Sequence, residues 1–527
     1  MKQRIGNLVA AASVALIVGL ALTFASTQPV RANDDPLKVA IDKGLAWIVP
    51  QQNVDGSWGS GCHRPAYTGL VVTKLATRAL ELGKKPTDPT YEYADEIAKG
   101  VDYILTQKHD IAIGMEPAGD PDGNGNGIGV YFDDCGWEIM YQTGIAMMAL
   151  SAVGRPADKG VVQDAVDFVA WAQADPACGA HRGGWRYWYD YCDSDNSNSG
   201  YVSLGLGYAA ASPPYGFGIT IPPFVYSELT LWLDVIQDDV NGDPDDGGSW
   251  YDPGTPWVNI LKTGNLIYEM GLTGDTRETA RVKDAVDYIE RHWADGGSCT
   301  AGWRGHRQAM FAMMKGLESL GIQKLDLDGD NVAEADWFAE VSQHLVDTQQ
   351  ADGSWPWDCW GDQLLSTTWA LLTLEKTVPP LAIPVAFDIK PGSCPNPIQT
   401  GSAGVLPVAI AGTATFDVTQ IDPASVVLGN PSLPLTIVAL PLRWSLEDVA
   451  TPYEPFLGKQ GALACHTLGA DGIMDLALKF DTKAVVPVLG AVTDGQVVVL
   501  QVRGKLKAEF GATPFVGEDV VRVLLKK

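Results

Sequence analysis

The sequence predicts a long α-helical region followed by a smaller β region. A helix-turn-helix pattern recurs six times before residue 378, and its 3.6-residue apolar period stops after Thr377. Short Val, Leu and Ile runs separated by Gly, Pro and Asn then fill 385–527, which is typical of an antiparallel β-sandwich. At roughly 150 residues per domain, 527 residues allow three domains, or one large and one small.

The net charge excludes two classes of partner. Lys and Arg number 37 against 64 Asp and Glu, which gives a charge of −27. A protein that follows phosphates needs a basic stripe, so we expect no nucleic-acid partner. An anionic membrane surface would repel the chain for the same reason.

The N-terminus has the pattern of an export signal. Lys2 and Arg4 precede an apolar run over 8–25, and small residues end at Ala32. This predicts a signal peptide over 1–32 that is cleaved after Ala32, with an uncleaved anchor helix as the alternative. Because no later stretch holds 18 unbroken apolar residues, we expect no membrane span after signal removal. The protein is therefore expected to be secreted, periplasmic or on the cell surface.

The repeated unit is a helix, a Gly/Trp turn and a second helix. The segment from Gln51 to Trp58 closely matches the one from Gln349 to Trp355. Glycine permits the positive φ values that a tight connection needs, and the Trp can cover the end of the helical hairpin. Looser copies lie between these two, at Gly136-Trp137, Gly184-Trp185, Gly248-Ser249-Trp250 and Gly302-Trp303.

This pattern resembles the Gln/Trp repeat of the terpenoid cyclase and protein prenyltransferase superfamily. The resemblance covers about residues 37–378 and implies an (α/α)6 toroid over 33–378, with six inner helices, six outer helices and a central cavity. The reaction does not carry over, because Asp243-Pro244-Asp245-Asp246 lies in a turn and not at the head of an inner helix. The zinc ligands of prenyltransferases are also incomplete, since Asp133-Asp134-Cys135 and Asp190-Tyr191-Cys192 lack a His at matching spacing.

Eight cysteines in an exported chain predict disulfides. A closed ring makes repeats one and six neighbours, and this predicts a Cys62–Cys359 bond because both residues lie four positions after a repeat Trp. Cys178 and Cys192 form a plausible local loop, and Cys394 and Cys465 are the two cysteines of the β region. Elimination leaves Cys135 with Cys299.

The stretch 379–384 is a Pro-rich linker, and 385–527 resembles a β module that recurs at the C-termini of exported bacterial proteins. The residues that carry this resemblance are Asp388–Asn396, Glu447–Pro452 and Gly469–Asp475. The resemblance implies an accessory, non-catalytic module.

One acidic loop has the spacing of a calcium site. Asp326, Asp328, Asp330 and Glu334 occupy positions 1, 3, 5 and 9, although Trp337 replaces the usual acid at position 12. A solvated acidic turn is the alternative. Two weaker candidates for calcium are Asp120–Asn126 and Asp239–Asp243.

Polar residues that head the inner helices are expected to face one mouth of the ring. His63 and Asp362 should meet across the closure, either as an acid–base pair or as a surface hydrogen bond. The full set comprises His63, Asp134, Glu138, His306, Asp358 and Asp362. An aromatic cluster beside the same turns either binds sugars or apolar rings or caps the bundle, and it includes Trp185, Tyr187, Trp188 and Tyr189.

Three functions remain open from the sequence. The first is a protein that binds a hydrophobic small molecule or a glycan in the central cavity. The second is a secreted carbohydrate lyase or hydrolase, and the third is a divergent terpenoid cyclase. An apolar lining favours binding, whereas convergent carboxylates or histidines favour sugar chemistry.

Overall fold

The computed structural model describes most of residues 35–525. Gaps fall at 212, 220, 241, 276, 278, 297–300, 331, 380, 382, 415, 431–432, 434–436, 455, 457–458, 460 and 508–513. The predicted signal peptide over 1–32 lies outside the described residues. Among those described, no helix combines the length and the apolar character that a membrane crossing requires.

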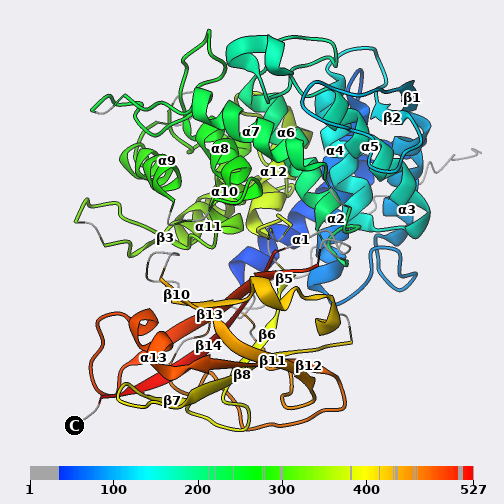
Figure 1. Ribbon diagram of the computed structural model, residues 1–527. Helices are drawn as coiled ribbons and strands as arrows, with labels where there is room; N and C mark the ends of the chain where they lie inside the picture. The colour runs from blue at the N-terminus through cyan, green and yellow to red at the C-terminus, as the bar shows by residue number, and fades with distance from the viewer. Residues whose placement is uncertain are drawn as a thin grey trace, which may run out of the picture.

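The helical region is an (α/α)6 toroid, as the sequence predicts (Figure 1). Inner helices bury almost every residue, whereas outer helices bury one face, as in α9, where Val282, Ala285, Tyr288 and Ile289 are buried. The outer helices are α1 (Pro36–Ile48), α3 (Ala94–Thr106), α5 (Lys159–Trp171), α7 (Pro223–Ile236), α9 (Ala280–Arg291) and α11 (Trp337–Thr348). The inner helices are α2 (Arg64–Glu81), α4 (Ile139–Val153), α6 (Asn196–Ala210), α8 (Ile260–Leu272), α10 (Arg307–Ser319) and α12 (Gln363–Leu374).

The ring closes because each inner helix packs against the next, and α12 packs against both α2 and α1. A buried charged group reinforces this joint. Glu375, at the C-terminal end of α12, pairs with Lys74 and Arg78 of α2, and the Lys74 and Glu375 side chains are almost wholly buried. Removing one partner of such a buried pair leaves an uncompensated charge, so the pairing favours the closed ring.

The repeated glutamine joins neighbouring repeats. Its side-chain amide donates to a glycine carbonyl in its own turn and to a carbonyl of the next outer helix. At the closure, Gln349 reaches Gly353 O and Ala40 O, both at 2.8 Å. The same double bond is made by Gln52, Gln173 and Gln237.

The repeated glycine allows the turn to touch the next outer helix. Gly353 has a φ of +97°, and a Cβ there would lie 2.4 Å from Lys43 O. Gly183 has a φ of +90°, and its Cβ would lie 1.9 Å from Glu228 O. Both the conformation and the close approach therefore require glycine.

The repeated tryptophan locks the turn onto the outer helix. Trp355 Nε1 donates to Leu345 O at 2.8 Å, and Trp58 Nε1 donates to Ile48 O at 3.0 Å. The placement of Trp137 in this role is wrong. Trp137 is 47% exposed, and Phe132 takes the position instead, since its backbone N–H bonds Thr143 Oγ1 as that of Trp58 bonds Thr68 Oγ1.

An inserted hairpin explains that error. β1 (Lys108–Ala112) pairs with β2 (Ile128–Phe132) between α3 and α4, so repeat two has a longer turn than the sequence pattern assumes. A second small pair, β3 (Lys324–Leu325) with β4 (Ala335–Asp336), flanks the predicted calcium loop between α10 and α11.

The β region lies beside the ring and forms a two-sheet sandwich (Figure 1). Its sheets enclose one apolar core, to which Leu478 and Leu500 belong. Most pairings are antiparallel, but β5 and β7 run parallel to β14. One sheet holds β5 (Ile383–Pro384), β7 (Pro397–Gln399), β9 (Val427–Gly429), β10 (Val438–Ala439), β13 (Val497–Lys505) and β14 (Pro514–Leu524). The other holds β6 (Ala386–Ile389), β8 (Val405–Ala411), β11 (Pro441–Glu447) and β12 (Asp475–Asp481).

Candidate functional site

The N-terminal ends of the six inner helices form one mouth of the ring. Each inner helix begins after a turn from its outer partner, so all six point the same way. The residues that precede the inner helices are His63, Glu138, Asp195, Asn259, His306 and Asp362. The mouth is therefore polar at the level of the helix ends, as the sequence predicts.

The predicted pairing of His63 with Asp362 is wrong. His63 Nε2 lies 3.4 Å from Glu138 Oε2, so it faces repeat two and not repeat six. Asp362 instead accepts a hydrogen bond from Tyr67 Oη at 3.0 Å and caps α12 through the Leu365 amide. Tyr67 lies one turn into α2 and reaches the closure that His63 was expected to reach.

The other predicted catalytic residues are held in separate structural roles. Asp134 accepts the backbone N–H groups of His63 at 2.8 Å and Arg64 at 3.2 Å. His306 has no exposed surface, and burial beside Lys262 and Arg307 lowers its pKa to about 4. The geometry thus does not bring His63, Asp134, His306 and Asp362 into one catalytic group.

The centre of the ring is crossed by side chains. Trp369 of α12 donates from Nε1 to Tyr201 Oη of α6, the diametrically opposite helix, at 3.1 Å. Lys315 of α10 donates to Gly200 O at 3.2 Å and lies over the Tyr201 and Tyr268 rings. The predicted central cavity is therefore interrupted by side chains at this level.

Five aromatic residues surround the mouth, and we call them the mouth arc. Trp137 stacks on Tyr187 with ring centroids 5.8 Å apart, and Tyr187 Oη lies 2.8 Å from Tyr251 Oη. Trp257 and Trp360 approach to 6.3 Å between centroids, across the start of α10. The three tryptophans are 47%, 39% and 57% exposed, respectively, so part of each indole is accessible from solvent.

Charged groups border the mouth arc. The Arg186 guanidinium lies 5.0 Å from the Tyr187 ring centroid and 5.6 Å from that of Tyr251, and it is 3.4 Å from Asp252 Oδ2. Lys262 Nζ lies 3.6 Å from the Trp257 ring centroid. Burial lowers the pKa of Lys262 to about 7. The Arg186 and Asp252 side chains are partly exposed and can donate to and accept from hydroxyls at the edge of a stacked ring, whereas Lys262 is buried.

The predicted aromatic cluster is only partly at the mouth. Tyr187 belongs to the mouth arc, but Trp185 is 1% exposed and holds its turn by donating to Val169 O, so its assignment as a ligand-binding residue is wrong. Trp188 and Tyr189 stack on each other, and Tyr189 also packs on Trp171 of α5, away from the inner helices.

Sequence reasoning missed Trp257 and Trp360 as ligand-binding candidates. Each lies two residues before the cap of an inner helix, Asn259 or Asp362, and Trp137 directly precedes Glu138. An apolar aromatic residue just before a polar cap was the available signal, because that position must lie at the rim of the mouth.

The predicted calcium loop brings three carboxylates together. Oxygen atoms of Asp326, Asp328 and Asp330 lie within 4.8 Å of one another. Hydrogen bonds inside the loop fix two of these side chains, since Gly329 N donates to Asp326 and Val332 N donates to Asp330. Glu334 is not in this close group, so calcium binding by all four residues remains a prediction.

The two weaker candidates for calcium differ in what the structure shows of them. In the loop 120–126, the Asp122 carboxylate accepts the backbone N–H groups of Gly125, Asn126 and Gly127, which occupies the oxygens that a cation would need. The candidate 239–243 includes Asn241, which lies outside the described residues.

Two of the predicted disulfides are present, Cys178–Cys192 and Cys394–Cys465. The predicted Cys62–Cys359 bond is wrong, because Cys62 is a free thiol while Cys359 is in a disulfide. The pairing of Cys135 with Cys299 is also wrong, since Cys135 is free; Cys299 itself lies outside the described residues. The disulfides are typical of an oxidising compartment.

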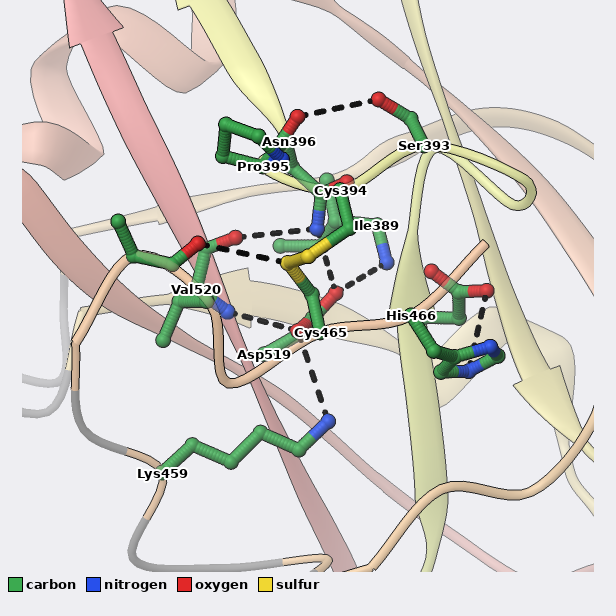
Figure 2. The surroundings of a disulfide bond; sticks show 12 residues. Ile389, Ser393, Cys394, Pro395, Asn396, Lys459, Cys465, His466, Asp519 and Val520 are labelled. Atoms are coloured by element: carbon green, nitrogen blue, oxygen red, sulfur yellow. Dashed lines mark hydrogen bonds and ion pairs between the residues drawn. A yellow bond between two sulfur atoms is a disulfide. The ribbon is translucent and has the colours of Figure 1, made fainter. Parts of the chain in front are cut away.

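A buried polar cluster surrounds the Cys394–Cys465 bond in the β region (Figure 2). Asp519 accepts hydrogen bonds from Ile389 N at 2.7 Å and from Asn396 Nδ2 at 3.0 Å, and its carboxylate lies 3.5 Å from Lys459 Nζ. Burial, with Asp519 nearby, raises the pKa of Asp388 to about 7. The cluster lies inside the sandwich, so we assign it to folding and not to ligand binding.

Comparison with known proteins finds no matching family model and no matching curated protein. Among solved structures, the chain is similar to a Salmonella alpha-2-macroglobulin reacted with methylamine, at TM-score 0.31 and 13% identity, over 93% of this chain and 31% of that one. It is also similar to a glycoside hydrolase family 15 glucoamylase from Hypocrea jecorina, at TM-score 0.25 and 10% identity, over 93% and 97%.

A third similar structure is the major subunit of aggregative adherence fimbriae type I from Escherichia coli. It matches at TM-score 0.13 and 12% identity, over 27% of this chain and 95% of that one. At these scores no activity or substrate carries over to this chain.

Proposed function

We propose that the protein is an exported glycan-binding protein whose ligand lies on the mouth arc. The observation that carries this proposal is the row of exposed aromatic faces at one end of the toroid. Trp137, Trp257 and Trp360 are all partly open to solvent, and each of them stacks on or approaches another ring of the arc.

Exposed aromatic rings bordered by charged groups match the chemistry of a sugar ring. A pyranose has an apolar C–H face that an aromatic ring can cover and equatorial hydroxyls that bond charged groups at its edge. Arg186 and Asp252 provide such groups next to Tyr187 and Tyr251.

Charge and packing narrow the ligand class. With a net charge of −27, the protein would repel an acidic polysaccharide, so we propose a neutral one. A hydrophobic ligand inside the ring is less compatible, since Trp369 and Tyr201 meet across the centre. Cyclase chemistry has no support either, because Asp243 to Asp246 lies in the turn between α7 and α8.

The test is affinity electrophoresis and calorimetry of the exported protein with soluble neutral polysaccharides, namely an α-glucan, a β-glucan and a galactomannan. We expect one of them to bind. The double variant Trp257→Ala/Trp360→Ala should weaken that binding roughly tenfold to a hundredfold, or about 1.4–3 kcal/mol. Trp444→Ala is the matched control, because Trp444 is 52% exposed but lies on β11 of the β region.

Three results would contradict the proposal. One is an absence of binding to all three polysaccharides, and another is equal affinity of the double variant and the wild type. The third is preferential binding of an apolar dye or lipid. If the protein releases new reducing ends from a polysaccharide that it binds, its function is hydrolysis and not binding alone.

A further inference from the structure

The two free thiols at the mouth are neighbours. The Cys62 side chain is close enough to Cys135 to raise the pKa of its thiol, and the backbone N–H of His63, next to Cys62, donates to Asp134, next to Cys135. Both residues are exposed and in irregular chain just before an inner helix, Cys62 before α2 and Cys135 before α4. They are 73 residues apart in the sequence, so this contact joins repeat one to repeat two.

The contact is held by neighbours on both sides of each cysteine. Asp134, directly before Cys135, accepts the backbone N–H groups of His63 and Arg64. Glu138, three residues after Cys135, lies 3.4 Å from His63 Nε2. Asp134 and Cys135 therefore face the segment of Cys62 because of a framework of hydrogen bonds and charge pairs that does not depend on the sulfurs.

We propose that Cys62 and Cys135 form a disulfide that joins repeats one and two of the toroid at its mouth. This inference is independent of the proposed glycan binding. It rests on the proximity of the two free thiols, on the Asp134 and Glu138 framework that holds their segments together, and on the disulfides already present elsewhere in the chain.

The bond forms by exchange with a disulfide of a protein oxidant. The Cys62 thiolate attacks one sulfur of that disulfide, which gives a mixed disulfide and releases one oxidant thiolate. Cys135 then loses its proton, attacks Cys62 Sγ and displaces the second oxidant thiolate. Two protein thiols are thereby oxidised to one disulfide, while the oxidant disulfide is reduced to two thiols.

The experiment is a peptide map of the full chain exported through the Escherichia coli periplasm. The protein is denatured with iodoacetamide present and digested with trypsin without reductant. Cys62 then lies in peptide 44–74 and Cys135 in peptide 109–159, because Arg64 and Arg155 each precede a proline, and each cysteine is the one cysteine of its peptide. We expect the two peptides to be linked and unlabelled, and to separate on reduction.

Variants test the role of the bond in the ring. Cys62→Ser, Cys135→Ser and the double variant should lower the melting temperature by the same several degrees, because each removes one and the same cross-link. If a variant fails to fold, the peptide map of the wild type still tests whether the disulfide forms. Cys178→Ser serves as a control that removes a different disulfide and leaves the link between peptides 44–74 and 109–159 in place.

Two outcomes would overturn the inference. The first is carbamidomethylation of both Cys62 and Cys135 in the unreduced wild type. The second is stoichiometric zinc in the purified protein with both thiols labelled only after chelation, which would assign the pair, with His63 and Glu138, to a metal site.

Discussion

The joints between repeats of the toroid and the polar cluster of the β region are built from different chemistry. Gln349 and its counterparts join repeats through neutral amide-to-carbonyl hydrogen bonds. The sandwich instead encloses the ionisable groups Asp388, Lys459 and Asp519 around a disulfide. A neutral amide joint has no protonation state, so these repeated bonds do not themselves depend on pH. The buried pair of Lys74 and Glu375 at the closure is the charged exception. A buried charged cluster fixes one arrangement but makes stability depend on pH.

The largest expected effect breaks a joint of the ring. Trp355→Ala removes a fully buried indole and its bond to Leu345 O at the closure. The free energy of unfolding should fall by about 3–5 kcal/mol, because the cavity cannot collapse between packed helices. Chemical denaturation followed by helical circular dichroism measures the change.

Trp357→Ala is the matched control, since Trp357 lies two residues away but is 74% exposed. It should change the unfolding free energy by less than about 0.5 kcal/mol. Comparable losses in the two variants would show that the turn, and not the buried indole, holds the joint.

The second prediction concerns the β region and its pH response. Burial raises the pKa of Asp388 from 3.8 to about 7, with Asp519 and Asp475 adding to the shift and Lys459 opposing it. The folded state therefore binds the proton more tightly than the unfolded state. Its contribution to stability is complete below about pH 3.8 and is lost as the pH rises through 7, with an upper bound of about 4 kcal/mol.

Asp388→Asn keeps the shape but cannot ionise. By differential scanning calorimetry, we expect it to approach the wild type near pH 4 and to exceed it above pH 7. Glu454→Gln is the control, because Glu454 is an exposed carboxylate of the same region. If the melting temperatures of Asp388→Asn and the wild type differ by the same amount from pH 4 to 8, the buried charged cluster does not make the stability of the β region depend on pH.

The ring was predictable from sequence because its joints are local. Gln349, Gly353 and Trp355 lie within seven residues, and the geometry needs all three, as the positive φ of Gly353 shows. Repeat two could not be aligned in this way, since the β1–β2 hairpin lengthens its turn and puts Phe132 in the tryptophan position.

The residue pairs at the mouth were less predictable, because they depend on which of the turns before the inner helices lie next to each other. His63 was expected to face Asp362, but its backbone has a φ of +65° and its ring lies next to Glu138. The predicted Cys62–Cys359 bond was wrong for the same reason, because the segment after Cys62 is held by Asp134 of repeat two. Both errors follow from knowing the order of repeats around the ring without knowing the path of each turn. Trp257 and Trp360 each lie two residues before a helix cap. The start of the inner helix therefore places them at the mouth, whatever path the preceding turn follows.

The smallest expected effect concerns a loop that belongs to neither kind of joint. Asp326, Asp328 and Asp330 lie in the insertion between α10 and α11, and Glu290 of α9 accepts the Asp326 N–H at 2.7 Å. If calcium binds there, EGTA should lower the stability of the ring by about 1.4 kcal/mol when calcium is at ten times its Kd. Asp328→Asn should abolish that response, whereas Asp122→Asn, in a loop whose carboxylate is held by its own amides, should not. A melting temperature unaffected by EGTA would identify the loop as a solvated turn. A shift larger than that of Trp355→Ala would mean that a cation, and not only neutral joints, holds the ring closed.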